Sequence, residues 1–364
     1  MRILITTDVV GGVWQFAKEL TTGLLQKRCA VALVSFGGAP STAQRQWCER
    51  LSSTYRENFR YEASPVPLEW MEDNGRAYRE VAPLLIEIAK GFQVDLIHAN
   101  QFCFGALPFN VPKVVTAHSD VLSWAEACRN EPLENSAWLR QYCRLVNDGL
   151  HGATVIAAPT RWMLSALARH FSFRTRGAVI PNGRSVPRVR SVGRKMQAIT
   201  AGRLWDEAKD IEMLKRVSSP IPLLAAGETQ HGSTQAAPFG NVELLGSLSE
   251  EDLLRQFRES AIYICTSRYE PFGLAPLEAA LCGCAVLARD IPSLREVWGE
   301  GALYFTDAAS LSSLLRSLSA DSELLQSSRR KSLRRARCFT AERMVNAYYA
   351  EFRRSIAETE QYVA

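Results

Sequence analysis

The sequence lacks any run of about eighteen consecutive apolar residues, so we expect no membrane-spanning helix. Its first segment, Met1 to Thr7, is too short for a signal peptide and has the composition of a first strand. The nine cysteines are odd in number, and none of their spacings is typical of a zinc ribbon or of a disulfide framework. A reduced, cytoplasmic chain is the simplest expectation.

Patterns typical of nucleic-acid binding are also missing, because no zinc finger, helix-turn-helix or interleaving of aromatic with basic residues occurs. Nucleic acid is therefore not an expected partner. The net charge of +5 is modest, but basic residues gather in two stretches. The first contains Arg174, Arg176, Arg184, Arg188, Arg190, Arg194 and Lys195, and the second Arg329, Arg330, Lys331, Arg334, Arg335 and Arg337. Such clusters attract anionic lipid headgroups but are also common on solvated helix faces, so peripheral membrane contact stays open.

Strand-like apolar runs alternate with longer helical patterns along the chain. The first series has strands at Ile3 to Thr7, Ala30 to Phe36, Leu96 to Ala99, Lys113 to Ala117 and Thr154 to Ala157, and helices at Val13 to Gln26 and Gly75 to Gly91. The second has strands at Ala198 to Ala201, Pro222 to Ala226, Val242 to Leu245, Ile262 to Thr266 and Ala285 to Ala288, and a helix at Glu250 to Ser260. This alternation predicts an α/β protein with parallel, doubly wound sheets.

The length of 364 residues is sufficient for two cores. We place the linker in the arginine-rich stretch from Pro181 to Arg194, which gives domains of residues 1–183 and 184–340. A terminal helix is expected from Ala341 to Glu358. Pro292 to Glu296 has the pattern of an ordinary helix start, with Ser293 and Glu296 forming a capping box.

The segment from Ser267 to Gly283 places two glutamates around a turn. Glu270 precedes Pro-Phe-Gly after a strand-like run, and Glu278 lies in the helical run that follows. Such a turn leaves backbone N–H groups free at the helix start, where an anion is favoured, and Gly273 permits close approach of the backbone. Amides for phosphate and carboxylates for hydroxyls suit a phosphorylated sugar, although most glutamates are simply solvated surface residues.

Three other loops that follow expected strands carry candidate binding groups. Arg203 and Lys209 lie six positions apart in a loop that opens a helix, where they are able to hold a diphosphate and offset its charge. Surface ion pairs with the neighbouring acidic residues are the alternative. Gly11 and Gly12 follow the first strand and permit backbone contact with a phosphate, or merely reverse the chain.

The third loop contains His118 and Asp120. A histidine directly after a strand is able to donate a hydrogen bond to a sugar hydroxyl, and Asp120 is a candidate ligand for an acceptor hydroxyl. A structural histidine held by backbone groups is the alternative.

The segment around Glu270 and Glu278 resembles the signature of the retaining nucleotide-sugar glycosyltransferases of family four, in which two glutamates separated by seven residues flank a Phe-Gly turn. The resemblance implies the GT-B architecture, two Rossmann-like domains facing across a cleft, with the C-terminal helix, 341–364, returning to the first. Two departures stand out. Lys209 is one position later than in the family, and Asp210 occupies the place of a glycine.

The resemblance also implies roles for individual residues. Gly11 and Gly12 face the donor diphosphate, and His118 contacts the transferred sugar. The amides of Phe272, Gly273 and Leu274 hold sugar hydroxyls and phosphate. Arg203 and Lys209 stabilise the departing diphosphate, Glu270 accepts from the sugar, and Glu278 accepts from the ribose. Pro181 to Gly183 resembles the hinge into the second domain.

These features together predict a hexosyltransferase that uses a UDP- or GDP-linked sugar and retains the anomeric configuration. The acceptor is a glycan, a lipid-linked sugar or a small molecule, and Phe102, Phe104, Phe109, Trp124 and Trp138 either line its pocket or form core. No Asp-x-Asp motif occurs, so we expect no metal and no cofactor. An epimerase of the same fold and a non-catalytic nucleotide-sugar-binding scaffold are the alternatives, whereas a pyridoxal-phosphate-dependent phosphorylase needs a much longer chain.

Overall fold

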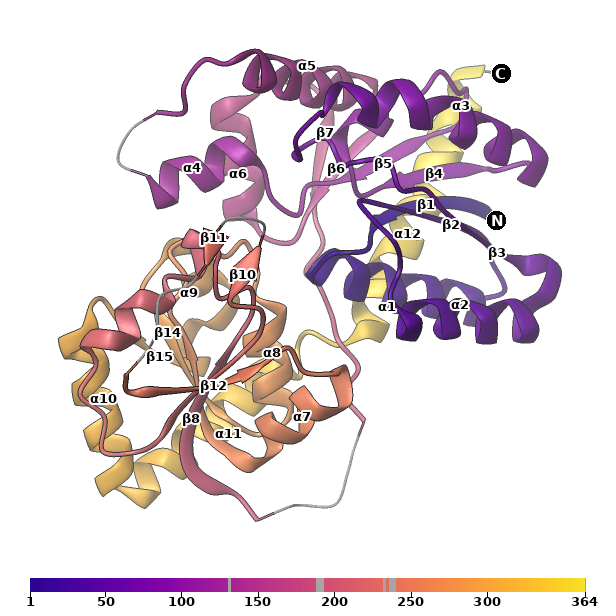
Figure 1. Ribbon diagram of the computed structural model, residues 1–364. Helices are drawn as coiled ribbons and strands as arrows, with labels where there is room; N and C mark the ends of the chain where they lie inside the picture. Colours follow the sequence, from indigo (N-terminus) through magenta and orange to yellow (C-terminus); the bar gives the residue numbers. More distant parts are fainter. Residues whose placement is uncertain (130–131, 188–192, 232–233, 236–239, 364) are drawn as a thin grey trace. The chain divides into compact units, whose positions relative to one another are not determined.

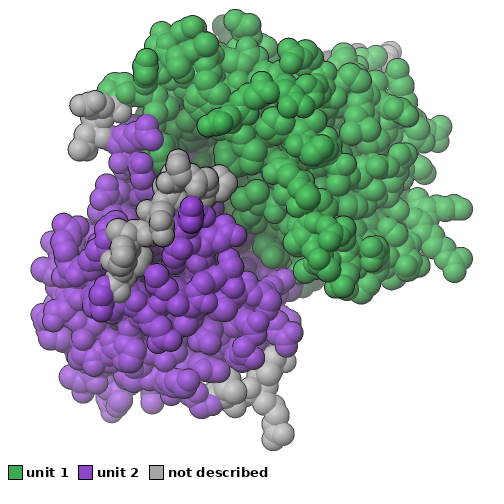
Figure 2. Space-filling model, viewed as in Figure 1, with its two compact units in different colours: residues 1–125, 131–183, 341–364 green, residues 126–130, 184–340 purple. Residues whose placement is uncertain are grey.

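The computed structural model describes residues 1–129, 132–187, 193–231, 234–235 and 240–363. The chain divides into two compact units (Figure 2). Unit 1 comprises residues 1–125, 131–183 and 341–364, and unit 2 comprises residues 126–130 and 184–340. The expected linker from Pro181 to Arg194 spans the boundary between residues 183 and 184, and its residues 188–192, with Arg188 and Arg190, lie outside the described residues.

Unit 1 is built on a seven-stranded sheet in which all pairings are parallel (Figure 1). The strand order is β3-β2-β1-β4-β5-β6-β7. The strands are β1 (Arg2–Asp8), β2 (Ala30–Phe36), β3 (Phe59–Ala63), β4 (Leu96–Ala99), β5 (Lys113–Thr116), β6 (Val155–Ala158) and β7 (Arg176–Val179). The order reverses between β1 and β4, and ligands of such sheets bind beyond the carboxyl ends of the strands at that reversal.

Helices cover both faces of this sheet. Along β1, Ile3 and Ile5 pack into one apolar layer and Leu4 into the other, because successive side chains of a strand point to opposite faces. The first layer includes α1 (Gly12–Gln26), α2 (Thr42–Tyr55) and α12 (Ala341–Val363). The second includes α3 (Gly75–Phe92), the 3₁₀ helix η2 (Phe102–Ala106), α5 (Ala137–Gly152) and α6 (Arg161–His170). Burial from both sides explains why β2 is apolar almost throughout.

Unit 2 contains a six-stranded parallel sheet of order β12-β9-β8-β13-β14-β15. Its strands are β8 (Lys195–Ala201), β9 (Leu223–Ala226), β12 (Val242–Gly246), β13 (Ser260–Cys265), β14 (Ala285–Arg289) and β15 (Ala302–Phe305). Its helices are α7 (Glu250–Glu259), α8 (Leu274–Leu281), α9 (Pro292–Trp298), α10 (Ala308–Ala320) and α11 (Ser322–Ala336). β10 (Gln230–His231) and β11 (Thr234–Gln235) form a separate antiparallel pair. Two apolar layers again cover the two faces.

Helix α12 ends the chain and belongs to unit 1, as the resemblance implied. Its apolar side contributes Met344, Val345, Tyr348 and Phe352 to the layer that contains α1. Gly23 of α1 permits this contact, because a Cβ there would lie 2.5 Å from Val345. The helix is therefore part of the core of unit 1 and not an appendage.

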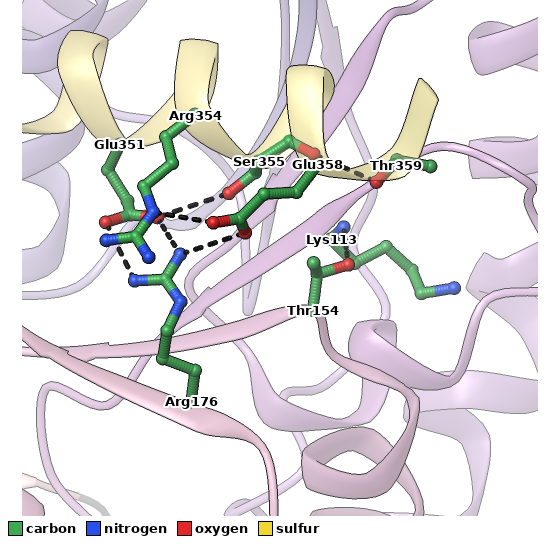
Figure 3. A network of polar contacts seen from close by, with 8 residues as sticks. All are labelled: Lys113, Thr154, Arg176, Glu351, Arg354, Ser355, Glu358 and Thr359. Carbon is green, nitrogen blue, oxygen red and sulfur yellow. Dashed lines mark hydrogen bonds and ion pairs between the residues drawn. The ribbon is translucent and has the colours of Figure 1, made fainter. Parts of the chain in front are cut away.

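Charged residues fix the polar side of α12 (Figure 3). Arg176 of β7 pairs with Glu351 and lies 3.7 Å from Glu358, and Glu358 also accepts a hydrogen bond from Arg354. A pocket of about 620 Å³ lies beside this network and is lined by Thr154, Arg176, Glu358, Thr359 and Gln361. It lies near the amino ends of β6 and β7, which is the edge of the sheet opposite to the expected ligand site.

The predicted fold class is confirmed, since both sheets are parallel and covered on both faces. The apolar patterns of the sequence did not predict β3, β7, β10, β11 and β15. The predicted capping box at Ser293 is wrong. Pro292 is the first residue of α9, Ile291 is its N-cap, and no side chain caps the helix. The fixed φ of proline suits the first helical position, and the helix therefore begins two residues earlier than the capping box would place it.

Several arginines of the two basic stretches serve the fold. The guanidinium of Arg194 donates to the carbonyl oxygens of Phe257, Ser260 and Cys282, and Arg329 donates to that of Gly283. These carbonyls lie at or just beyond the ends of α7 and α8, where a cation is favoured. No helix in the described part of the chain is both long and apolar enough to cross a membrane.

Candidate donor site

The carboxyl ends of β8 and β13 bring together two of the predicted site loops of unit 2. These strands are neighbours and run parallel, so the loop after Ala201 and the loop after Cys265 emerge at the same edge of the sheet. As a result, Lys209 Nζ lies 2.5 Å from Glu270 Oε2. Ser267 Oγ also lies 3.3 Å from this carboxylate oxygen. Lys209 and Glu270, which the sequence analysis proposed from two different loops, thus form one ion pair.

Lys209 lies one position later than the lysine of the family, and the extra residue is accommodated in a short 3₁₀ turn, η3 (Glu207–Lys209). Asp206 caps this turn by accepting a hydrogen bond from the backbone N–H of Ala208 at 2.9 Å, and the Ala208 side chain is buried. The turn directs Lys209 toward Glu270. Burial is the largest single effect and lowers the pKa of Lys209, but the Glu270 carboxylate and Cys265 together outweigh it. The pKa is therefore raised and the ammonium stays charged.

The second departure from the family is Asp210, which occupies the usual place of a glycine, and its backbone conformation is one that aspartate tolerates. Its φ is +43°, in the left-handed region that glycine adopts most easily and that aspartate tolerates better than most residues. Arg268 donates to both of its carboxylate oxygens, at 2.8 and 3.1 Å, and Arg289 pairs with it as well. These contacts fix the residue next to Lys209.

Arg203 is placed differently. Its guanidinium lies 2.6 Å from Asp206 Oδ2 and 5.4 Å from the centre of the Trp205 ring, and its side chain is 42% exposed. A half-exposed cation that is held by one carboxylate and one ring is preoriented but still accessible to a phosphate.

The turn between the two glutamates has the geometry that an anion site needs. Gly273 has a φ of +90° and is the N-cap of α8, and a Cβ there would lie 2.8 Å from Pro276. The Phe272 ring is buried and packs edge-on against Phe339, with centroids 5.4 Å apart. The backbone amides of Phe272, Gly273 and Leu274 are therefore the candidate donors to a ligand in this turn, and the Phe272 ring is not.

Glu278 is buried in the second turn of α8 and is joined to an arginine that the sequence analysis did not select for the site. Arg184 Nε donates to Glu278 Oε1 at 2.6 Å, and Arg184 Nη2 lies 2.8 Å from Glu250 Oε1. The sequence analysis had counted Arg184 with the basic surface stretch. The structure corrects this, because Arg184 is only 2% exposed. No local pattern indicates a partner 94 positions away.

In unit 1, the carboxyl ends of β1, β4 and β5 bring three polar groups together. Asn100 donates to the carbonyl oxygen of Thr6 at 2.6 Å, and its Oδ1 lies 2.7 Å from His118 Nε2. Gly11, with a φ of +70°, is the N-cap of α1, which begins at Gly12, and open space lies where its Cβ would be. Asn100 follows β4 directly and was missed.

The contact with Asn100 sets the proton position on His118. An amide oxygen only accepts, so Nε2 carries the proton and Nδ1 is left as an acceptor. Because Nε2 donates to Asn100, Nδ1 is the ring nitrogen suited to a sugar hydroxyl, as an acceptor. The contact of His118 with the transferred sugar stays a prediction. The ring packs edge-on against Phe16, with centroids 4.6 Å apart. Burial lowers the pKa of His118 to about 3, so it is neutral at physiological pH.

Asp120 and the aromatic residues of the expected acceptor region have structural contacts. Asp120 is buried at the start of α4 (Val121–Cys128), where its Oδ1 accepts from the Ser123 amide at 2.8 Å. Phe102 and Phe104 belong to the core, Phe109 packs against it, and Trp138 donates to the Met71 carbonyl oxygen and stacks on Tyr142. The core alternative is correct for Phe102 and Phe104. Trp124 is half-buried, and the contact of Asp120 with an acceptor stays a prediction.

Two histidines, the buried His98 and the half-buried His118, make the stability of unit 1 depend on pH. His98 Nε2 lies 2.9 Å from Thr116 Oγ1, and burial, helped by nearby His118, lowers its pKa to about 3. His118 has the same low value. An unfolded histidine has a pKa of about 6.5, so the unfolded chain binds more protons as the pH falls from that value toward 3. Stability is thus complete above pH 6.5 and is lost as the pH falls.

We expect the free energy of unfolding, measured with urea, to fall by up to ~2 kcal/mol for each of these two histidines between about pH 7 and about pH 5. The His98→Phe variant keeps an aromatic ring in the same packed site and should lose less stability over that interval than the wild type. Equal pH dependence of the two proteins would contradict the assignment of this effect to His98.

Two family models match the chain. The model described as Glycosyltransferase Family 4 matches residues 10–186, and the model described as Glycosyl transferases group 1 matches residues 211–335. Together they cover most of the chain, and the second includes Glu270 and Glu278.

Among curated proteins, the chain is 22% identical over 298 residues to the alpha-monoglucosyldiacylglycerol synthase of Streptococcus pneumoniae. The aligned region covers 71% of this chain and 66% of that protein. It is 43% identical over 54 residues to the serotype-specific mannosyltransferase WbdA of Escherichia coli, which covers 15% of this chain. The matched part spans only 7% of the length of WbdA.

Solved structures share the fold at low sequence identity. Sucrose-phosphate synthase from Thermosynechococcus elongatus matches with a TM-score of 0.79 and 18% identity, over 98% of this chain and 100% of that one. WaaG, a glycosyltransferase involved in lipopolysaccharide biosynthesis, matches with a TM-score of 0.67 and 13% identity, over 96% and 98%. The sequence matches and the two parallel-sheet units together show that this chain belongs to the glycosyltransferases of family 4 and has the GT-B fold.

Proposed function

We propose that the protein transfers a hexose from a nucleoside diphosphate sugar, UDP- or GDP-linked, to an acceptor hydroxyl, with retention at the anomeric carbon. The observation that carries this proposal is the meeting of Lys209 and Glu270 beside the half-exposed Arg203, at the carboxyl edge of the unit 2 sheet. Two cations next to a carboxylate suit a diphosphate that is joined to a sugar, because the cations bind phosphate oxygens and the carboxylate accepts from hydroxyls.

The chemistry follows from the charge that develops during transfer. As the bond between the anomeric carbon and the diphosphate breaks, negative charge grows on the leaving oxygen. Arg203 and Lys209 stabilise this charge more strongly than they stabilise the intact donor, so they lower the barrier and do not merely tighten binding. An ammonium group has three N–H donors, so Lys209 is able to keep Glu270 and bind a phosphate oxygen at the same time.

The remaining donor contacts are assigned by chemistry. The amides of Phe272, Gly273 and Leu274 bind phosphate and sugar oxygens at the start of α8. Glu270 accepts from a hydroxyl of the sugar, and Glu278 accepts from the ribose. Gly11, Gly12 and His118 remain predictions that rest on the family resemblance.

Relatives indicate which acceptors to test first. One is named a mannosyltransferase and another a synthase of alpha-monoglucosyldiacylglycerol. We propose a glycan or lipid-linked hydroxyl as acceptor, with a small molecule as the alternative, and a cytoplasmic protein that contacts the membrane surface when the acceptor is a lipid. Sedimentation with anionic vesicles tests this contact, and a chain that stays in the supernatant at low salt contradicts it.

Transfer is tested by incubating the purified chain with UDP- and GDP-hexoses and with glycan or diacylglycerol acceptors, while release of the nucleoside diphosphate is measured. We expect release that depends on an acceptor and continues in EDTA, and a product whose anomeric configuration, determined by NMR, is that of the donor. Conversion of the sugar nucleotide without any acceptor would instead indicate an epimerase. Binding without turnover would indicate a scaffold, and inverted product would contradict retention.

A further inference from the structure

Arg184 is a buried cation that nothing in the proposed chemistry uses directly. It is the first residue of the main segment of unit 2, residues 184–340, and follows the Pro-Asn-Gly segment of residues 181–183. Removing a guanidinium from water is costly unless carboxylates and hydrogen bonds compensate, and here Glu278 and Glu250 both do so. The two carboxylates differ in setting, since the Glu278 side chain is 11% exposed and that of Glu250 is 40% exposed. The close, buried contact is the one with Glu278.

The backbone of Arg184 is anchored to the same part of unit 2. Its N–H donates to the Phe339 carbonyl oxygen at 3.1 Å, and Arg184 forms a parallel bridge with Thr340. The Phe339 ring packs against Phe272, in the turn between the two glutamates. Main chain and side chain of Arg184 are thus both fixed to the segment that carries the predicted donor contacts.

We propose that Arg184 is a positioning residue that sets the orientation of the Glu278 carboxylate for recognition of the donor ribose. A glutamate side chain has several rotatable bonds, and ordering it when a ligand binds costs free energy. By holding Oε1 at 2.6 Å, Arg184 removes that freedom before the ligand arrives. A carboxylate has about four acceptor positions, so the bond to Arg184 does not by itself prevent Glu278 from accepting from vicinal hydroxyls.

This inference rests on the proposed function, because it assumes that Glu278 binds a ribose. A positioning role predicts that replacing Arg184 weakens only the part of the binding that depends on the 2′ and 3′ hydroxyls of the ligand. A general loss of stability would weaken binding of nucleotides with and without these hydroxyls alike. The test measures binding of UDP, GDP and ADP and of their 2′,3′-dideoxy analogues by isothermal titration calorimetry, with the full chain.

We expect the wild type to bind one ribonucleotide about tenfold more tightly than its dideoxy analogue, because hydrogen bonds to a charged group are at stake. The Arg184→Met variant should bind both forms alike, with the affinity of the ribonucleotide reduced toward that of the analogue. Arg184→Lys should restore part of the preference, and Glu278→Gln should lose it. These are the results that a positioning role requires.

The matched control is Arg194→Met. Arg194 also lies partly buried in unit 2, but its guanidinium donates to backbone carbonyls of Phe257, Ser260 and Cys282 and not to Glu278. This variant should lose stability and keep the ribose preference. If Arg184→Met does not fold, Arg184→Lys decides the matter, because a preference as large as that of the wild type would overturn the proposal.

The outcomes separate the two levels of the argument. Failure of the wild type to bind any nucleotide overturns the proposed function, and this inference with it. Nucleotide binding by the wild type with an unchanged ribose preference in Arg184→Met overturns the positioning role alone.

Discussion

Replacing Lys209 with methionine is expected to lower kcat for hexosyl transfer by about 10²- to 10³-fold, the loss typical of removing one preorganised donor from a developing anion. Methionine fills much of the same space, so the change removes mainly the charge. The same variant should also unfold at a lower temperature, since Glu270, whose side chain is 14% exposed, is left without its ammonium partner at 2.5 Å.

A second variant separates these two effects. Lys209→Met combined with Glu270→Gln removes both charges, and replacing both partners of an ion pair costs far less stability than removing one. We expect the melting temperature to recover in the double variant while kcat stays low. Lys195→Ala is the control for activity. Lys195 also pairs with a glutamate, Glu259, but it lies at the start of β8, at the opposite edge of the sheet, and its side chain is more exposed than that of Lys209. Recovery of activity together with stability would show that Lys209 acts only through the fold.

Replacing Arg203 with alanine is expected to lower kcat by about 10²-fold with only a small fall in melting temperature. The Arg203 side chain is 42% exposed, so its ion pair contributes little to stability, and Asp206, which is 6% exposed, keeps the hydrogen bond from the Ala208 amide. Steady-state kinetics with varied donor should show the loss in kcat more than in KM, because the cation acts mainly on charge that develops in the transition state.

Arg255→Ala provides the matched control for Arg203. Arg255 also pairs with an aspartate three positions away, Asp252, and is exposed on α7. The Arg255→Ala variant should leave both kcat and the melting temperature unchanged. A loss of activity in Arg203→Ala that is accompanied by an equal fall in KM, or that is matched by Arg255→Ala, would contradict the role of Arg203 in stabilising the leaving group.

The parts of this account that the sequence could predict are those that local patterns encode. Continuous apolar runs such as Ala30–Phe36 marked buried parallel strands, and glycine after a strand marked loops at the carboxyl edge. Weakly patterned edge strands such as β3, in which only Phe59 is fully buried, were missed because exposure on one side removes the apolar signal.

Site residues could likewise be predicted where a local pattern marked them, but not where a contact between distant segments placed them. Glu270 and Lys209 could be proposed from loop position, but their direct contact follows from the pairing of β8 with β13, which no local pattern reveals. Arg184 and Asn100 were missed for the same reason, as their partners lie far away in the sequence. The contact of Asn100 with His118 Nε2 joins residues 18 positions apart, so it has no local signal either.

The most direct test of the central claim is a thermal-shift measurement with UDP, GDP, ADP and CMP and their sugars. At about a hundred times its dissociation constant, a ligand stabilises the folded chain by ~2.7 kcal/mol, enough to raise the melting temperature by several degrees. The account predicts a shift for one nucleoside diphosphate and its sugar in the wild type, and a much smaller shift in Lys209→Met with Glu270→Gln. Absence of any shift in the wild type would contradict a nucleotide-sugar site in unit 2.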